Sequence, residues 1–182
     1  MSSVQSAVTT DQRPALVKTL LASPILGPVA ALLMASIFFA VMSPRFLTGP
    51  NFSLILQQVM VVGVLAIGQT LVIITTGIDL SNGMVMALSG VLIASFAAQK
   101  GLNPWLAILI GLVIAMAFGM LNGGLVTGIG LPAFIVTLGT MNIAYALTRI
   151  YTTSTITNLP KELTFLGETF NVAGTAIAYG TV

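Results

Sequence analysis

Long apolar stretches alternate along the chain with short breaks that are polar or rich in glycine and proline. A helix needs about 20 predominantly apolar residues to cross the hydrocarbon core of a bilayer, and most of these stretches approach or exceed that length. We therefore expect an all-α fold, a polytopic transmembrane helical bundle. The expected helices cover about residues 24–42, 54–76, 84–98, 106–126 and 133–151, with a polar tail at 1–19 and the start of a further segment at 171–182.

One carboxylate, Asp79, lies between two apolar runs and has no other acid near it. An ionisable group at the centre of a membrane helix costs roughly 2.5 to 3.5 kcal/mol on insertion scales, so it marks a functional site by default. Gly77 and Gly83 flank this residue and permit backbone angles that a continuous helix does not need. We expect broken or re-entrant helices around Gly77–Gly83 and around Gly123–Pro132.

Two roles are open for Asp79. A carboxylate at the N-terminus of a helix that begins between Ser81 and Met84 would be stabilised by the helix dipole, by about 0.3 to 1 kcal/mol. Alternatively, Asp79 orients a break that lines a polar path or contacts another subunit. The first role predicts that transport survives Asp79→Asn, and the second predicts that it falls.

Other polar and small residues within the apolar stretches also have two interpretations. Gln69 either bonds to a neighbouring helix or lines a polar path. Thr137 and Asn142 are weak indications of a substrate contact, because such side chains in membrane helices most often bond to their own backbone. Gly119 and Gly123, four residues apart, permit close helix packing or the close approach of a ligand.

Composition excludes several classes of protein. With 57% hydrophobic and 5% charged residues, the chain is too apolar for a soluble globular domain, in which about 25% of residues are charged. The continuous apolar runs do not alternate as a transmembrane β-barrel requires. The basic residues form no run, so we expect no nucleic-acid partner. Without Cys, His or a close pair of carboxylates, we expect no metal site, catalytic residue or cofactor.

The N-terminal run and the basic residues bear on membrane topology. The apolar run Pro24–Met42 exceeds the 7 to 15 residues of a signal-peptide core, so we expect a transmembrane helix rather than a cleaved signal. Five spans with the N-terminus inside would place four of the six basic residues outside, against the positive-inside rule. A re-entrant hairpin at 77–98 would satisfy that rule, and the charge count alone favours it.

Several short motifs occur in a recognisable order: Phe46-Leu47-Thr48 with Asn51, Gly68-Gln69-Thr70-Leu71-Val72-Ile73 running into Gly77-Ile78-Asp79-Leu80-Ser81, Asn122-Gly123, Pro132-x-Phe134-Ile135-Val136-Thr137-Leu138-Gly139-Thr140-Met141 and Leu159-Pro160. With this order and spacing, over about residues 42–168, the chain resembles the membrane permeases of ABC-type sugar importers, the ribose and xylose permease group. It departs from the family pattern at Asn82, where a small apolar residue is usual, and at Tyr145-Ala146, where an Arg-Gly pair is frequent.

The resemblance implies a multi-pass permease subunit of the bacterial inner membrane that provides the translocation path for a monosaccharide. It implies as partners membrane lipid, a second permease subunit in a homo- or heterodimer, cytoplasmic ATP-binding subunits and a periplasmic sugar-binding protein. ATP hydrolysis would reside on a separate subunit, so the chain would not itself be an enzyme. It also implies an N-terminus inside, a periplasmic loop around Leu159-Pro160, and a partial permease domain at 20–182, truncated to about half the family's length.

The motifs and the polar residues of the apolar stretches together give the candidate site, a substrate path or conformational break. Its members are Gln69, Gly77, Asp79, Ser81, Gly83, Asn122, Phe134, Thr137 and Asn142. An alternative is a secondary transporter or channel that uses Asp79 as an ion site. An integral membrane enzyme is the third class, and it lacks a visible catalytic constellation.

Overall fold

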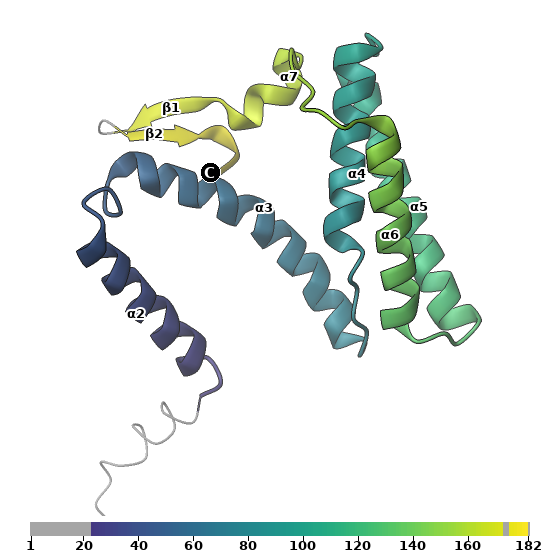
Figure 1. Ribbon diagram of the computed structural model, residues 1–182, viewed down its shortest axis with the longest axis horizontal. Coiled ribbons are helices and arrows are strands. Elements are labelled where there is room, and N and C mark those ends of the chain that lie inside the picture. Colours follow the sequence, from purple (N-terminus) through teal and green to yellow (C-terminus); the bar gives the residue numbers. More distant parts are fainter. Residues whose placement is uncertain (1–22, 173–174, 182) are drawn as a thin grey trace, which may run out of the picture. The chain divides into compact units, whose positions relative to one another are not determined.

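The computed structural model describes residues 23–172 and 175–181, and Figure 1 shows its elements. The polar tail expected at 1–19 lies outside the described residues. The chain divides into two units that meet between Asn51 and Phe52, and each is described by itself.

The first unit is built around the helix α2 (Leu26–Met42), none of whose residues is buried. After the helix ends the chain turns, and the ring of Phe46 stacks on that of Phe39 with the ring centroids 5.9 Å apart. The side-chain amide of Asn51 donates to the Phe46 carbonyl at 2.8 Å, which fixes the turn. An apolar helix with no buried side chain is typical of a segment that uses lipid or other protein as its solvent.

The second unit holds most of the chain. Its long helices are α3 (Gly49–Ile74, whose first residues lie in the first unit), α4 (Asn82–Ala94), α5 (Pro104–Gly128) and α6 (Ala133–Tyr151). A π-helical turn (Ser95–Gln99) extends α4. The short C-terminal elements are α7 (Lys161–Thr164), a 3₁₀ turn (Phe165–Gly167), β1 (Thr169–Val172), β2 (Thr175–Ala178) and a second 3₁₀ turn (Tyr179–Thr181).

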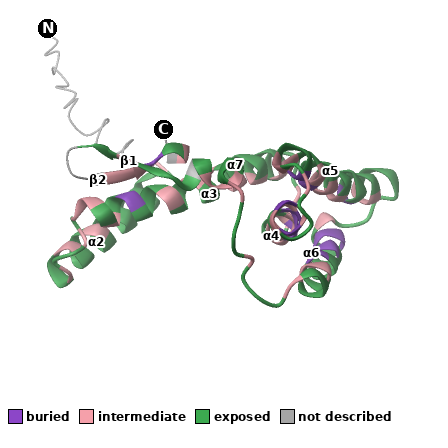
Figure 2. Ribbon diagram, turned by 90° about the horizontal axis from the view of Figure 1, so that it is seen from above, coloured by how far each residue is buried: buried purple, intermediate pink, exposed green. Residues whose placement is uncertain are grey.

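The core of this unit lies where α4 packs against α5 and α6, which run side by side in Figure 1. Leu88 and Leu92 of α4 and Ala144 of α6 are buried together. Figure 2 shows that buried residues gather on α4 and α6, whereas the outer faces of the helices are exposed. The exposed side chains are themselves largely apolar, as expected of helices that face hydrocarbon.

Within the described residues, four helices are long and apolar enough to cross a membrane: α3, α4 with its π-helical turn, α5 and α6. The helix α2, at 17 residues, is a shorter apolar helix. The prediction of an all-α, polytopic membrane bundle is confirmed. The 18-residue length of Asn82–Gln99 is that of a crossing helix, by length and composition.

The break expected around Gly77–Gly83 is present, since residues 75–81 between α3 and α4 are not helical. The prediction that the break extends to Gly83 was wrong, because Gly83 lies in the first turn of α4. The second break is also shorter than expected. The helix α5 continues through Gly123 to Gly128, and Gly130, with φ of 79°, turns the chain before α6.

The segment expected at 171–182 forms, over its described residues, part of an antiparallel hairpin and a 3₁₀ turn. The strands pair Phe170 with Ile177 and Asn171 with Ala176. The ring of Tyr179 lies 5.1 Å from those of both Phe165 and Phe170. These aromatic contacts hold the hairpin, and hydropathy alone does not reveal them.

Close packing of α4 against α5 depends on Gly111. A Cβ atom at this position would lie 2.6 Å from Cδ1 of Ile93 and 3.3 Å from the carbonyl oxygen of Ser89. Gly124 on the same helix has no neighbour within 4 Å of the corresponding position, among the residues described. The glycine that brings two helices together is therefore Gly111, and not one of the glycines at the end of α5.

We expect Gly111→Val to destabilise the α4–α5 pair by about 1 to 3 kcal/mol, because Ile93 must move to make room. Gly124→Ala is the matched control, and it should be neutral or raise the free energy of unfolding by about 0.5 to 1 kcal/mol. Both changes in the free energy of unfolding can be measured by SDS unfolding in detergent micelles, monitored through the fluorescence of the single tryptophan, Trp105. Equal effects of the two substitutions would contradict the assignment.

Candidate functional site

The helix α3 ends in a hydrogen-bonded turn that starts the break. The amide of Thr76 donates to the Ile73 carbonyl at 2.9 Å, and that of Gly77 donates to the Val72 carbonyl at 3.0 Å. This pair of bonds is the Schellman motif, which satisfies carbonyls at the end of a helix. The chain is thus redirected at a defined point and does not fray.

Thr76 occupies the left-handed position of this motif, with φ of 60°. Glycine is usual there, and a β-branched residue is strained. We expected the glycines to supply the unusual backbone angles, and this was wrong for Gly77, whose φ is not positive. Gly77 allows a close approach to the end of α3, because a Cβ atom there would lie 3.1 Å from Cγ1 of Val72 and 3.3 Å from its carbonyl oxygen, a tight contact.

Asp79 closes the loop onto the start of α4. Its Oδ1 atom accepts hydrogen bonds from the amide of Ser81 at 2.7 Å and from the hydroxyl of Ser81 at 2.6 Å. Because α4 begins at Asn82, the carboxylate lies at the positive end of that helix, as the capping role requires. The bonded amide is that of Ser81, so Asp79 orders the residue before the helix and not a helical amide.

Asn122 of α5 joins this turn to the neighbouring helix. Its Nδ2 donates to the hydroxyl oxygen of Ser81 at 2.9 Å, and both side chains are buried. The hydroxyl of Ser81 donates a hydrogen bond to Asp79. The hydroxyl oxygen of Ser81 therefore accepts the hydrogen bond from Asn122. The three side chains form one chain of hydrogen bonds, Asn122 to Ser81 to Asp79, which joins the break to α5.

Thr137 fixes the same loop to α6. Its Oγ1 accepts from the amide of Leu80 at 3.2 Å and lies 3.1 Å from the carbonyl oxygen of Ile78 and 2.8 Å from that of Ala133. The hydroxyl has one proton, so it donates to one of these carbonyls at a time. Thr137 is buried on α6, so its hydroxyl is a fixed partner for the amide of Leu80 in the loop.

Two cavities border this network. The larger, of about 530 Å³, is lined mainly by α4 and α5, and the smaller, of about 320 Å³, by the loop, α5 and the start of α6. Asp79, Gly119 and Asn122 line both cavities. Asp79 is the one charged residue in either lining, so the surroundings are neutral apart from its carboxylate.

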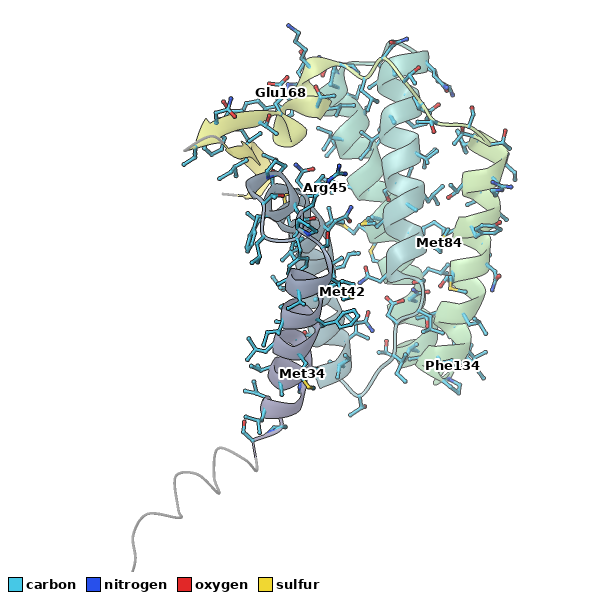
Figure 3. All side chains as sticks on the ribbon, turned by 60° about the vertical axis from the view of Figure 1, so that its left-hand side comes forward. Met34, Met42, Arg45, Met84, Phe134 and Glu168 are labelled. Carbon is cyan, nitrogen blue, oxygen red and sulfur yellow. The ribbon has the colours of Figure 1, made fainter. Side chains whose placement is uncertain are left out.

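The other candidate residues do not join the network. Gln69 is half-buried on α3, and Gly83 has no close neighbour in the described chain. Phe134, labelled at the start of α6 in Figure 3, is 51% exposed. Asn142 is exposed, and its amide donates to the carbonyl of Leu138 on its own helix at 2.8 Å. The hydrogen bond of Asn142 to the Leu138 carbonyl is the local bond that polar residues of membrane helices usually make.

Sequence reasoning missed two members of this region. Asn82 was noticed only as a departure from the family pattern, yet its amide donates to the Leu65 carbonyl of α3 at 3.3 Å. Ser89 of α4 is buried and lines the larger cavity. Its spacing of seven from Asn82 places both on one face of α4, and this was the available signal.

We expect Thr137→Val to lower the free energy of unfolding by about 0.5 to 1.5 kcal/mol, because the part-buried amide of Leu80 loses its hydrogen-bond partner. Hydrogen exchange at residues 77–81 should also become faster. Thr140→Val is the matched control, since Thr140 is buried but bonds only to Val136 and Thr137 carbonyls of its own helix. If the amides of residues 77–81 exchange at the same rate in both variants, Thr137 does not fix the loop to α6.

Comparison with known proteins adds to this geometry. Residues 51–181 match the family described as the permease component of branched-chain amino acid transport systems. A fructose import permease of Rhizobium meliloti is 37% identical over 167 residues, which are 88% of this chain and 46% of that protein. A ribose import permease of Bacillus subtilis is 42% identical over 127 residues, which are 70% of this chain and 39% of that protein.

A ribose import permease of Escherichia coli strain K12 is similar at 38% identity, over 70% of this chain and 40% of that protein. The chain therefore spans less than half the length of these curated relatives. No solved structure shows a significant match. With a family match that covers the whole site described above, the chain belongs to the family of permease components of the branched-chain amino acid transport type.

Proposed function

We propose that this chain forms part of the membrane path of an ABC-type importer for a monosaccharide. The observation that carries the proposal is the helical break at residues 75–81, whose polar groups are held by Asp79, Ser81, Asn122 and Thr137 between two cavities. Polar groups that line a cavity where a helix is interrupted mark the binding sites of many transporters.

The chemistry of the site favours a neutral sugar over an amino acid, although the family description mentions amino acids. The N-terminus of a broken helix ordinarily binds a carboxylate. Here that position at α4 already has the carboxylate of Asp79, and neither cavity lining includes a basic residue. The other polar groups of the two linings are side-chain amides and hydroxyls, which form hydrogen bonds with the hydroxyl groups of a sugar. The relatives described above are named for fructose and ribose, which agrees with this choice.

The remaining assignments follow from the family. The importer would use a second permease subunit, ATP-binding subunits on the cytoplasmic side and a periplasmic sugar-binding protein, in a bacterial inner membrane. ATP hydrolysis would occur on the partner, and this chain would supply the path and the movement of its helices. The broken region, with its strained Thr76, is the place where rigid helices could change their mutual angle.

The test is uptake of labelled ribose and fructose into proteoliposomes that contain this chain, its ATP-binding subunit and its sugar-binding protein from the same source. We expect ATP-dependent uptake of a sugar and none of leucine. Uptake of leucine would contradict the choice of substrate class. Sugar uptake that needs a proton or sodium gradient and no ATP would support the alternative of a secondary transporter.

Two substitutions of Asp79 sharpen this test. Asp79→Asn keeps an oxygen that accepts both bonds from Ser81 but removes the charge, whereas Asp79→Ala removes both bonds. If Asp79 orders the break, Asp79→Asn should retain most of the uptake, and Asp79→Ala should lower it by about tenfold or more. An ion site would require the charge, so the loss of uptake in both variants would contradict the ordering role.

A further inference from the structure

Aromatic and basic residues gather at one end of the α4, α5 and α6 bundle, which we call the aromatic end. The ring of Phe96, in the π-helical turn after α4, lies 6.3 Å from the ring of Tyr151, the last residue of α6. The Nζ atom of Lys100 lies 4.8 Å from the centroid of the Phe96 ring. Trp105 is 68% exposed in the first turn of α5, a helix that contacts the π-helical turn, and Arg149 lies in the last turn of α6.

The composition of the aromatic end is typical of a membrane surface. Tryptophan and tyrosine concentrate where lipid headgroups meet hydrocarbon, and a lysine there keeps its stem on apolar surface while its charge reaches water. The polar segment 152–160, which follows α6, forms neither helix nor strand and needs water for its backbone groups. These features favour a position among lipid headgroups.

The hydrogen-bonded side chains of Asp79, Ser81, Asn122 and Thr137, here called the Asp79 network, lie at the other end of the same helices. Figure 1 shows that the break before α4 and the turn between α5 and α6 share this end. Each residue of an α-helix adds about 1.5 Å to its length, so the three helices give the distance between the two ends.

The three distances agree with one another. The 18 residues of α4 and its π-helical turn span about 27 Å. Trp105 and Asn122 are about 26 Å apart along α5, and Tyr151 and Thr137 are about 21 Å apart along α6. The hydrocarbon core is about 30 Å thick, so its midplane is about 15 Å from either surface. Even at a helix tilt of about 40°, the upper limit of the usual range, the depths are about 16 to 21 Å, beyond the midplane.

The backbone of the break also requires water. The amides of Ile78 and Asp79 donate no hydrogen bond within the described part of the chain. An amide without a partner is costly in hydrocarbon, and water at a membrane surface removes that cost. Ile78 is 52% exposed, so the rest of the described chain does not cover the loop.

We infer that the aromatic end is anchored among the lipid headgroups of one membrane surface and that the Asp79 network lies near the opposite surface, where water reaches the break. Asp79 is then far from the centre of the bilayer, where a carboxylate is most costly. This inference goes beyond the proposed function, because it concerns the position of the network in the membrane and not the substrate.

Tryptophan fluorescence tests the depth of both ends. Trp105 is the only tryptophan of the chain, and we expect lipids brominated near the headgroup to quench it about twofold more than lipids brominated near the chain ends. Trp105→Phe with Ile78→Trp moves the reporter to the break and should keep this order. Trp105→Phe with Met116→Trp is the control on the exposed middle of α5, and it should reverse the order. Stronger quenching by the deep bromines at position 105 or 78 would overturn the inference.

Cysteine labelling tests whether the two ends lie at opposite surfaces, since the native chain has no cysteine. The full chain with Thr153→Cys and Ile78→Cys together is placed in liposomes and treated with a maleimide that does not cross membranes. We expect one label per molecule in intact liposomes, whichever way the chain is inserted, and two after a pore-forming peptide opens them. Met116→Cys should take no label in either case. Any other count for the double variant, such as two labels in intact liposomes or one in opened liposomes, would overturn the inference.

Discussion

The need to satisfy backbone polar groups within apolar surroundings is the constraint on which the rest of this structure depends. Residues 75–81 leave the helical pattern, so their amides and carbonyls lose the bonds that a helix supplies and need other partners. Carbonyls of Val72 and Ile73, the hydroxyl of Thr137 and the carboxylate of Asp79 serve as partners. The break is therefore a defined structure, held from three helices.

This constraint explains why a carboxylate is present in so apolar a chain. Asp79 accepts two hydrogen bonds and lies at the positive end of α4, so its cost in the membrane is offset by local bonds and by the helix dipole. In doing so it sets the direction of the hydrogen bonds from Asn122 through Ser81, and the amide oxygen of Asn122 has no partner in the described part of the chain. The contacts of Asp79 agree with the capping interpretation, which does not exclude the proposed role in the path.

The sequence predicted the helices and the first break well, because long apolar runs and glycine punctuation are strong local signals. It predicted Asp79, Ser81, Asn122 and Thr137 as candidates, and the structure brings these four together. It did not predict which glycine matters for packing, because Gly111 is distinguished only by Ile93 of another helix. Ser89 was missed for the same reason, since a lone serine in an apolar run gains meaning only from the cavity beside it.

The central claim is that the Ser81–Asn122 hydrogen bond ties the break to α5. A double-mutant cycle with Ser81→Ala and Asn122→Ala, measured as the free energy of unfolding in detergent micelles, tests it most directly. We predict a coupling energy of about 0.6 kcal/mol and at most about 1.7 kcal/mol, the average and the maximum found for polar side chains that bond between membrane helices. Additive effects, with a coupling energy within error of zero, would contradict the account.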